Sequence, residues 1–154
     1  MLRACTDVEW FEDYRLGDTF AGEPTAFTED DIISFARRYD PQPFHIDRAA
    51  AEASHFGGIV ASGTHMFATV WGGIIRAGFL NDRAMGADIV QFHFKSPARP
   101  GDVVTSLTTV REVRLSTSRP DRGYVTFESE VANQRDEIVL RFAHRQLIST
   151  RPRQ

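Results

Sequence analysis

The chain has 154 residues, of which 42% are hydrophobic and 25% charged, and its formal net charge is -3. This length fits one domain with a single core, and the charge balance argues against a nucleic-acid-binding protein. The single cysteine, Cys5, excludes an intrachain disulfide framework and a multi-cysteine metal site.

The first residues, Met1 to Glu9, lack the apolar run of a signal peptide. No window of the chain approaches the roughly 18 apolar residues that a membrane span requires. We therefore expect a cytoplasmic protein without a membrane partner.

The first predicted elements are a short strand and a helix. Residues 19–27 suit a strand, although Gly22 and Pro24 weaken it. Thr28 is a good N-cap for a helix that ends near Tyr39, because the next residue precedes a proline. Apolar residues recur along one face of this helix: Ile32, Phe35, Ala36 and Tyr39.

The segment from Asp40 to Asp47 then predicts a stiff, non-helical turn, because prolines flank Gln42 on both sides. This turn carries the acid Asp40 and the imidazole of His45 five positions apart. Proton-transfer chemistry needs two groups of different basicity in a fixed relation, and a rigid turn supplies it. The alternative is a surface loop with a capping aspartate and a solvated histidine.

Two further helices follow this turn. Asp47 can cap a short helix from Arg48 to about Ser54. Residues 64–77 then predict a long helix that is too apolar for a surface position, with Gly78 as its C-cap. A helix of this kind is expected to be wrapped by a sheet.

Gly63 lies where this apolar helix begins. Its amide would be one of the first-turn donors without a partner inside the helix, and such a donor suits an anion or a carbonyl oxygen that gains negative charge. A glycine would also let a ligand come close. The alternative is that Ser62 caps the helix and Gly63 serves packing.

The second half of the chain alternates apolar and polar residues, which predicts strands. Four strands are expected, at residues 90–94, 103–113, 124–131 and 138–142. Because short turns join them, we expect an antiparallel meander. Together with the early strand it would form a curved sheet around one long helix, an α+β fold.

The five histidines raise the question of a metal site. Asp40, His45, Asp47 and His55 could be imagined as one cluster, but no pair has the spacing of a known site. His93 and His144 fall within strands, where structural histidines are common. We therefore expect no metal.

The segment Asp40-Pro41-Gln42-Pro43-Phe44-His45 resembles the hydratase motif of the MaoC-like, (R)-specific enoyl-CoA hydratase family. The resemblance continues through residues 56–65 and 97–102, and it covers the chain from about Phe11 to Ile148. It implies a hot-dog fold, in which an antiparallel sheet curls around a central helix with helices inserted after the first strand. The whole chain, 1–154, would be one such domain, with roughly 10 N-terminal and 5 C-terminal residues peripheral.

The resemblance also implies residue roles. Asp40 and His45 would be the catalytic pair that holds and activates water, and Gly63 would be the amide donor to the thioester oxygen. Ser62 and Gln42 would contribute to substrate binding. The reaction would be the reversible addition of water to a 2,3-enoyl thioester in fatty acid metabolism, in a homodimer or a higher homo-oligomer. No cofactor is expected apart from coenzyme A or an acyl carrier as part of the substrate.

Two residues depart from the family pattern. The motif commonly has asparagine where this chain has Gln42, and some members place a serine where this chain has Trp71. The bulky indole favours a short or unusual acyl group. Two other functions remain open: a hot-dog thioesterase and a non-catalytic subunit that binds acyl thioesters.

Overall fold

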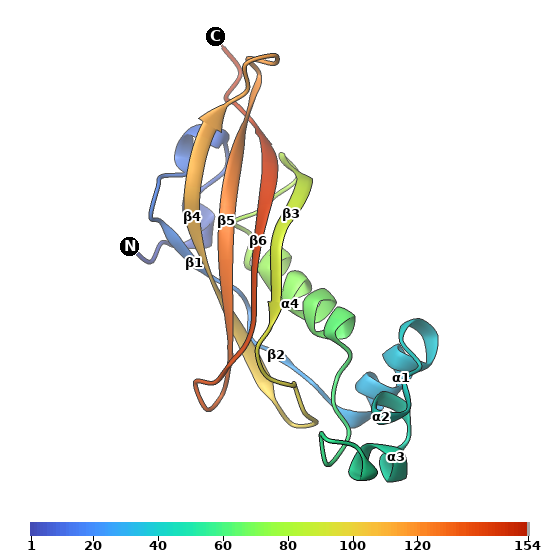
Figure 1. The fold of residues 1–154 in the computed structure, drawn as a ribbon. Helices are drawn as coiled ribbons and strands as arrows, with labels where there is room; N and C mark the ends of the chain where they lie inside the picture. Colours follow the sequence, from blue (N-terminus) through green and yellow to red (C-terminus); the bar gives the residue numbers. More distant parts are fainter. Residues whose placement is uncertain (154) are drawn as a thin grey trace.

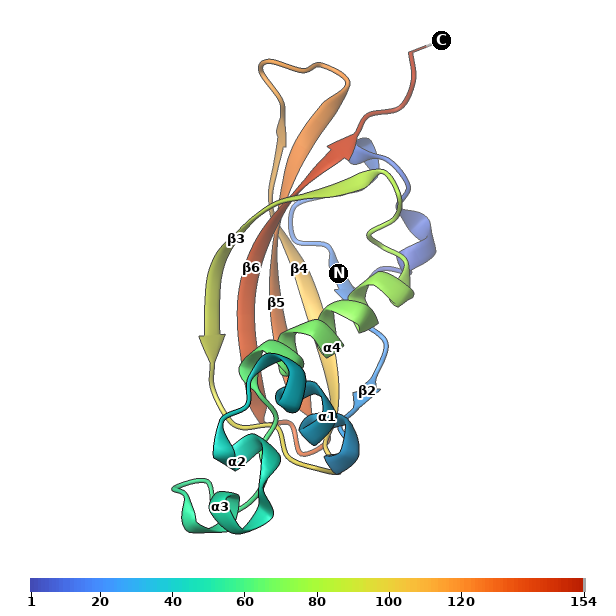
Figure 2. The same cartoon turned by 90° about the vertical axis from the view of Figure 1, so that its right-hand side faces the viewer.

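The computed structural model describes residues 1–153 and shows a curved antiparallel sheet that wraps around one long helix (Figures 1 and 2). Within these residues the sheet has six strands: β1 (Thr19–Ala21), β2 (Thr25–Ala26), β3 (Ala84–Phe94), β4 (Val103–Leu115), β5 (Arg122–Asn133) and β6 (Ile138–Ser149). The expected α+β architecture is confirmed.

The strand order differs from the prediction. The order across the sheet is β1-β4-β5-β6-β3, and β2 also pairs with β4. Strands β4, β5 and β6 form the expected meander, but β3 pairs with β6, for example Phe92 opposite Phe142. The prediction of a four-strand meander is therefore wrong for its first strand. Residues 95–102 instead carry the chain across the end of the sheet from β3 to β4. Strands that follow one another in sequence are not always neighbours in a sheet.

The long helix α4 (Gly63–Ala77) lies against the concave face of the sheet (Figure 2). Its buried residues include Met66, Val70 and Ile74. Gly78 ends it in the left-handed conformation, with φ of 94°, as predicted. The other helical segments are the 3-10 turns η1 (Cys5–Asp7) and η2 (Phe11–Asp13) and the helices α1 (Glu29–Tyr39), α2 (Pro43–Ile46) and α3 (Arg48–Ala53).

Helices α1, α2 and α3 form a group at one end of the sheet (Figure 1). Side-chain caps fix two of them: Thr28 accepts a hydrogen bond from the Asp31 amide at 3.1 Å, and Asp47 accepts one from Ala50 at 2.7 Å. Both caps were expected from the sequence.

Helix α2 was not expected, and the prediction of a non-helical turn is wrong for its four residues. Gln42 is extended, with φ of -68° and ψ of 139°, and Pro43 occupies the first helical position. A proline is tolerated there because the missing N–H would have no partner inside the helix. One helical turn therefore holds His45.

The core lies between α4 and the sheet and continues into the N-terminal segment. Phe20 and Phe79 stack with ring centroids 4.7 Å apart, and Val8, Phe11 and Tyr14 are also buried. No helix among residues 1–153 is long and apolar enough to cross a membrane.

Candidate active site

A cavity of about 480 Å³ opens where the α1–α3 group meets the first turn of α4 and the end of β3. Its apolar lining consists of Phe44, Phe56, Val60, Ala61, Met66, Phe94 and Pro97. Four predicted site residues meet there, although they come from different elements: Asp40, Gln42, His45 and Gly63. The cavity thus combines an apolar wall with one acid and one imidazole.

His45 is held in one orientation by the backbone of the segment that precedes α4. The residue is 5% exposed, and its Nδ1 lies 2.6 Å from the carbonyl oxygen of Val60. Because a carbonyl only accepts hydrogen bonds, Nδ1 carries the hydrogen, and the lone pair of the neutral ring is on Nε2.

The Nε2 atom of His45 faces Asp40, whose Oδ2 lies 3.6 Å away. This distance is too long for a direct hydrogen bond. One water molecule about 2.8 Å from each atom could hydrogen-bond to both. The pair therefore has the geometry to hold a water between an acceptor nitrogen and a carboxylate.

Asp40 follows the last residue of α1, and its amide donates to the Ala36 carbonyl at 2.9 Å. The Gln42 side chain donates to Asp40 Oδ1, also at 2.9 Å. This hydrogen bond is the main cause that lowers the pKa of Asp40; the Ser62 hydroxyl and the charge of His45 add to it, while burial opposes it. Asp40 is therefore a carboxylate at neutral pH, and Gln42 stabilises it in that form.

Gly63 is the first residue of α4. Within residues 1–153 its amide has no hydrogen-bond partner, since the helical ladder begins with Met66 donating to Ser62. A Cβ at Gly63 would overlap the ring of Phe94, which packs against the glycine. The amide is therefore free, and the missing side chain serves packing, whereas the expected cap by Ser62 is wrong because its side chain makes no capping hydrogen bond.

Ser62 is the predicted site residue that does not line the cavity. It is fully buried, and its hydroxyl lies 2.7 Å from that of Thr64 instead of capping the helix. A role of Ser62 in binding substrate stays a prediction.

Sequence reasoning did not identify three groups of this site: the Val60 carbonyl, the Phe94 ring and the Lys95 side chain. A carbonyl carries no sequence signal. Phe94 and Lys95 reach the cavity only because β3 runs along the edge of the sheet beside β6, and the sequence did not reveal this pairing. Among residues 1–153, no three His, Cys, Asp or Glu side chains converge in a way that could hold a metal ion.

Known proteins are similar to this chain in sequence and in structure. Residues 14–133 match the family model of the MaoC like domain. A MaoC-like dehydratase from Rhodospirillum rubrum has 37% sequence identity and a TM-score of 0.89, with 95% of this chain and 100% of that chain covered. The YdeM protein of Bacillus subtilis (strain 168) is 29% identical over 126 residues, which are 81% of this chain and 88% of YdeM.

A more distant structure shows the shared fold. An (R)-hydratase from A. caviae, involved in PHA biosynthesis, has a TM-score of 0.71 at 20% identity, with 90% of this chain and 98% of that chain covered. The expected hot-dog fold is thus confirmed. The family model covers most of the chain and includes both Asp40 and His45, so this protein belongs to the MaoC-like dehydratase family.

Proposed function

We propose that this protein reversibly adds water to a 2,3-enoyl thioester and forms an (R)-3-hydroxyacyl thioester. The observation that carries the proposal is the arrangement of Asp40 and His45, 3.6 Å apart in a mainly apolar cavity, with the His45 tautomer fixed by Val60. Membership of a family with dehydratases and (R)-hydratases among its structural neighbours supports it.

In this mechanism the pair positions one water molecule beside C3 of the substrate. One of the two groups accepts a proton from the water as the hydroxyl adds to C3. The electrons of the double bond move toward the thioester oxygen, and the same proton then returns at C2. Asp40 and His45 are unchanged at the end, and the substrate has gained a hydroxyl group at C3 and a hydrogen at C2. Such proton transfer contributes about 10²–10⁴-fold to a rate.

The free amide of Gly63 is the proposed donor to the thioester oxygen. It lies at the N-terminus of a 15-residue helix, where the helix dipole favours negative charge. One donor aimed at an oxyanion typically contributes about 3–4 kcal/mol to transition-state stabilisation.

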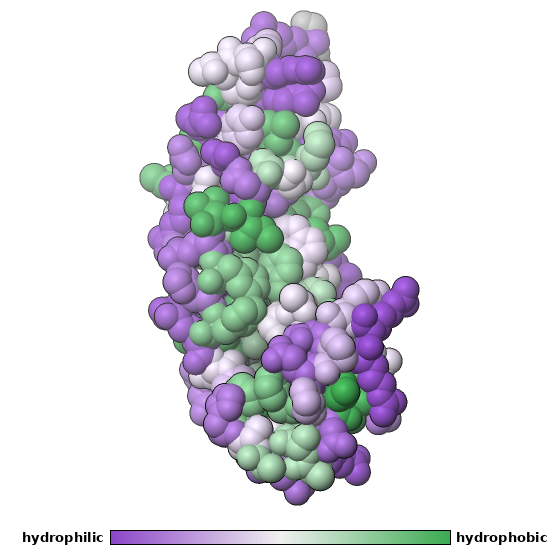
Figure 3. Space-filling model, turned by 45° about the vertical axis from the view of Figure 1, so that its right-hand side comes forward, coloured by the Kyte–Doolittle hydropathy of each residue, from purple (hydrophilic) through white to green (hydrophobic). Residues whose placement is uncertain are grey.

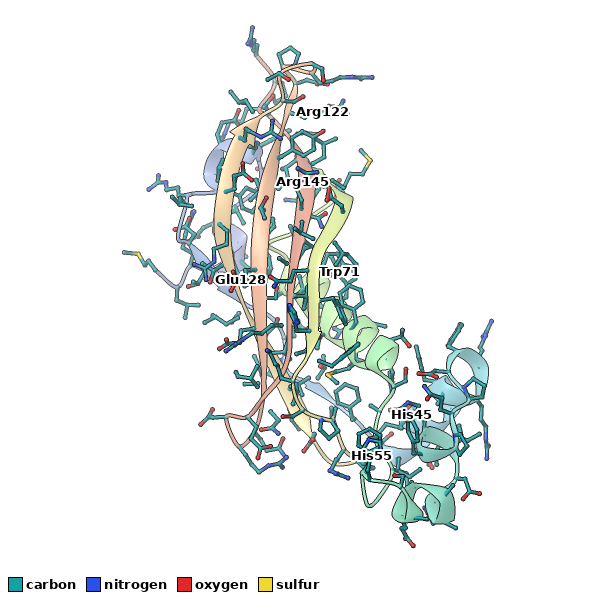
Figure 4. All side chains as sticks on the ribbon, viewed as in Figure 1. His45, His55, Trp71, Arg122, Glu128 and Arg145 are labelled. Carbon is teal, nitrogen blue, oxygen red and sulfur yellow. The ribbon has the colours of Figure 1, made fainter. Side chains whose placement is uncertain are left out.

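The acyl group is expected to be short. Trp71 is eight residues after Gly63, about 12 Å along the helix axis, and Figure 4 places it beside β3, away from His45. Its ring stacks on Phe67 and meets the His144 ring edge-on, with centroids 5.8 Å and 5.0 Å apart. These rings lie outside the cavity lining, and the proposal is that they stop an acyl chain from extending along α4.

The active form is proposed to be a homodimer that pairs through β3. Within residues 1–153 this strand has a neighbour on one side alone, and its eleven residues include no buried one. Apolar side chains gather on this side of the molecule (Figure 3). Exposed residues of β3 and α4 contribute to them: Ile75, Met85, Ile89, Val90 and Phe94.

The test measures the loss of ultraviolet absorbance of crotonyl-CoA and longer or branched enoyl-CoAs, with free thiol followed in parallel. We expect hydration of the short substrates without thiol release. Asp40→Asn and His45→Gln should each lower kcat by about 10²–10⁴-fold. Coupling to an (R)-specific dehydrogenase would confirm the configuration of the product.

Two substitutions outside the cavity serve as controls. Asp30→Asn removes a carboxylate at the other end of α1, and His55→Gln removes a histidine that does not line the cavity; both should keep the wild-type rate. Thiol release would instead indicate a thioesterase. Tight acyl-CoA binding with no turnover would indicate a non-catalytic binding subunit.

A further inference from the structure

Lys95 is the single lysine among the 18 basic residues of the chain, and it lines the cavity that holds Asp40 and His45. It directly follows β3, and its amide donates to the Val139 carbonyl at 2.9 Å. The backbone at Lys95 is thus fixed, while its side chain is exposed at the open side of the cavity. A cation is therefore presented at a solvent-exposed part of the cavity lining.

The charge of Lys95 is not used within the fold. Among residues 1–153 no carboxylate lies within 4 Å of its ammonium group, whereas most arginines form ion pairs. Arg99, the next basic residue along the chain, donates to the Phe56 carbonyl at 2.7 Å and so holds the loop beside the cavity. Asp40 is the one acidic residue of the cavity lining, and it bonds to Gln42.

We propose that Lys95 binds a phosphate of the thioester carrier, a phosphopantetheine borne by coenzyme A or by an acyl carrier protein. This inference rests on the proposed function, since the reacting carbons lie at Asp40 and His45 and the carrier arm must leave through the open side. When the acyl group itself is uncharged, the phosphates of the carrier are the anionic part of the substrate. A lysine is a compact charge on a long flexible stem, which suits a phosphate near the surface.

Binding measurements test this without any turnover. Calorimetric titration would compare coenzyme A, a holo acyl carrier protein and pantetheine, which lacks phosphate. We expect Lys95→Ala to bind the phosphate-bearing ligand about 10-fold more weakly than wild type, and Lys95→Arg to bind it almost as tightly as wild type. The affinity for pantetheine should not change. Added salt should lower the affinity of wild type for the phosphate-bearing ligand more than that of Lys95→Ala.

The matched control is Arg119→Ala, which removes one positive charge in the turn between β4 and β5, at the far end of the sheet from the cavity (Figure 1). It should bind all three ligands like wild type, and thermal unfolding would verify that each variant is folded. The ligand whose affinity falls in Lys95→Ala, coenzyme A or the carrier protein, identifies the source of the phosphate.

Three results would overturn the assignment: equal affinity of wild type and Lys95→Ala for both phosphate-bearing ligands, an equal loss for pantetheine, or no binding of either carrier by wild type. The hydration assay is independent. If Lys95-dependent binding is found but no enoyl thioester is hydrated, the hydratase proposal fails and the carrier site stands. If hydration occurs but Lys95→Ala binds both carriers normally, the hydratase proposal stands and the assignment of Lys95 fails.

Discussion

Gln42 illustrates how one side chain sets the chemistry of its neighbour. The hydratase motif that this segment resembles commonly has asparagine at this position, and the longer glutamine of this chain reaches Asp40 with a hydrogen bond of 2.9 Å. Because this bond stabilises the charged form, it lowers the pKa of the carboxyl group. The departure from the pattern therefore preserves an ionised acid beside His45.

Two glycines of α4 give a contrasting pair of substitutions. At Gly63 an added Cβ meets the ring of Phe94, which can shift because this residue is 55% exposed. At Gly73 an added Cβ would lie 2.6 Å from the carbonyl oxygen of Glu23, which is backbone and cannot move freely. The two alanine variants are therefore expected to fail in different ways.

We predict that Gly63→Ala changes the free energy of unfolding by less than about 1 kcal/mol but lowers hydration at least about 10-fold, because the methyl group and the displaced ring crowd the amide. Gly73→Ala should lose about 1–3 kcal/mol of stability through overpacking. Urea unfolding and the crotonyl-CoA assay measure both effects. A fully active Gly63→Ala variant would contradict the proposed role of this amide.

At the scale of elements, local chemistry predicted the helix ends well. Thr28 and Asp47 accept hydrogen bonds from free backbone amides at the start of a helix, and Gly78 ends one. These are short-range contacts, which the sequence specifies directly. The motif likewise predicted that Asp40 and His45 lie together. The turn of α2 escaped prediction, because a proline is compatible both with a loop and with the first position of a helix.

Strand β3 shows where local patterns fail. The sequence predicted residues 90–94, but the strand begins at Ala84, and its residues are largely exposed on both faces. Alternation of apolar and polar residues arises when one face is buried and the other solvated. It is present at residues 90–94, which the sequence predicted, but missing from residues 84–89. The same exposure hides the pairing of β3 with β6 and, with it, the approach of Phe94 and Lys95 to the site.

Val90 provides a test of the proposed pairing of two copies along β3, since this residue is 61% exposed. We predict that wild type is a dimer in size-exclusion chromatography with light scattering. Val90→Lys should weaken the dimer on the order of 100-fold, because two lysines would be desolvated at the interface. Leu115→Lys is the control, a 56% exposed apolar residue at the end of β4. A wild-type monomer, or an unaffected Val90→Lys dimer, would contradict the proposal.

At the scale of the whole molecule, a buried histidine links stability to pH. His144 of β6 is 1% exposed and lies between the rings of Phe127 and Phe142. The Gln146 amide is 3.0 Å from its Nδ1, and within residues 1–153 its Nε2 has no partner. Burial disfavours the charged ring and lowers the pKa of His144 to about 4. His65 has a lowered pKa for the same reason.

The sign of the effect follows from these values. As pH falls below the ordinary histidine pKa of 6.5, the unfolded chain binds a proton that folded His144 does not accept until about pH 4. This contribution to stability is complete above pH 6.5, is lost as pH falls toward 4, and stays constant below it. The gap corresponds to about 3 kcal/mol.

We predict that wild type loses at least about 2 kcal/mol of unfolding free energy between pH 7 and pH 4.5, and that His144→Leu loses about 2 kcal/mol less over the same interval. Urea unfolding at both pH values provides the measurement, and the comparison of slopes removes the cost of leaving Gln146 without its partner. His93→Gln, at an exposed position of β3, should keep the wild-type slope. An identical pH dependence in wild type and His144→Leu would show that this ring is not the group that links the core to pH.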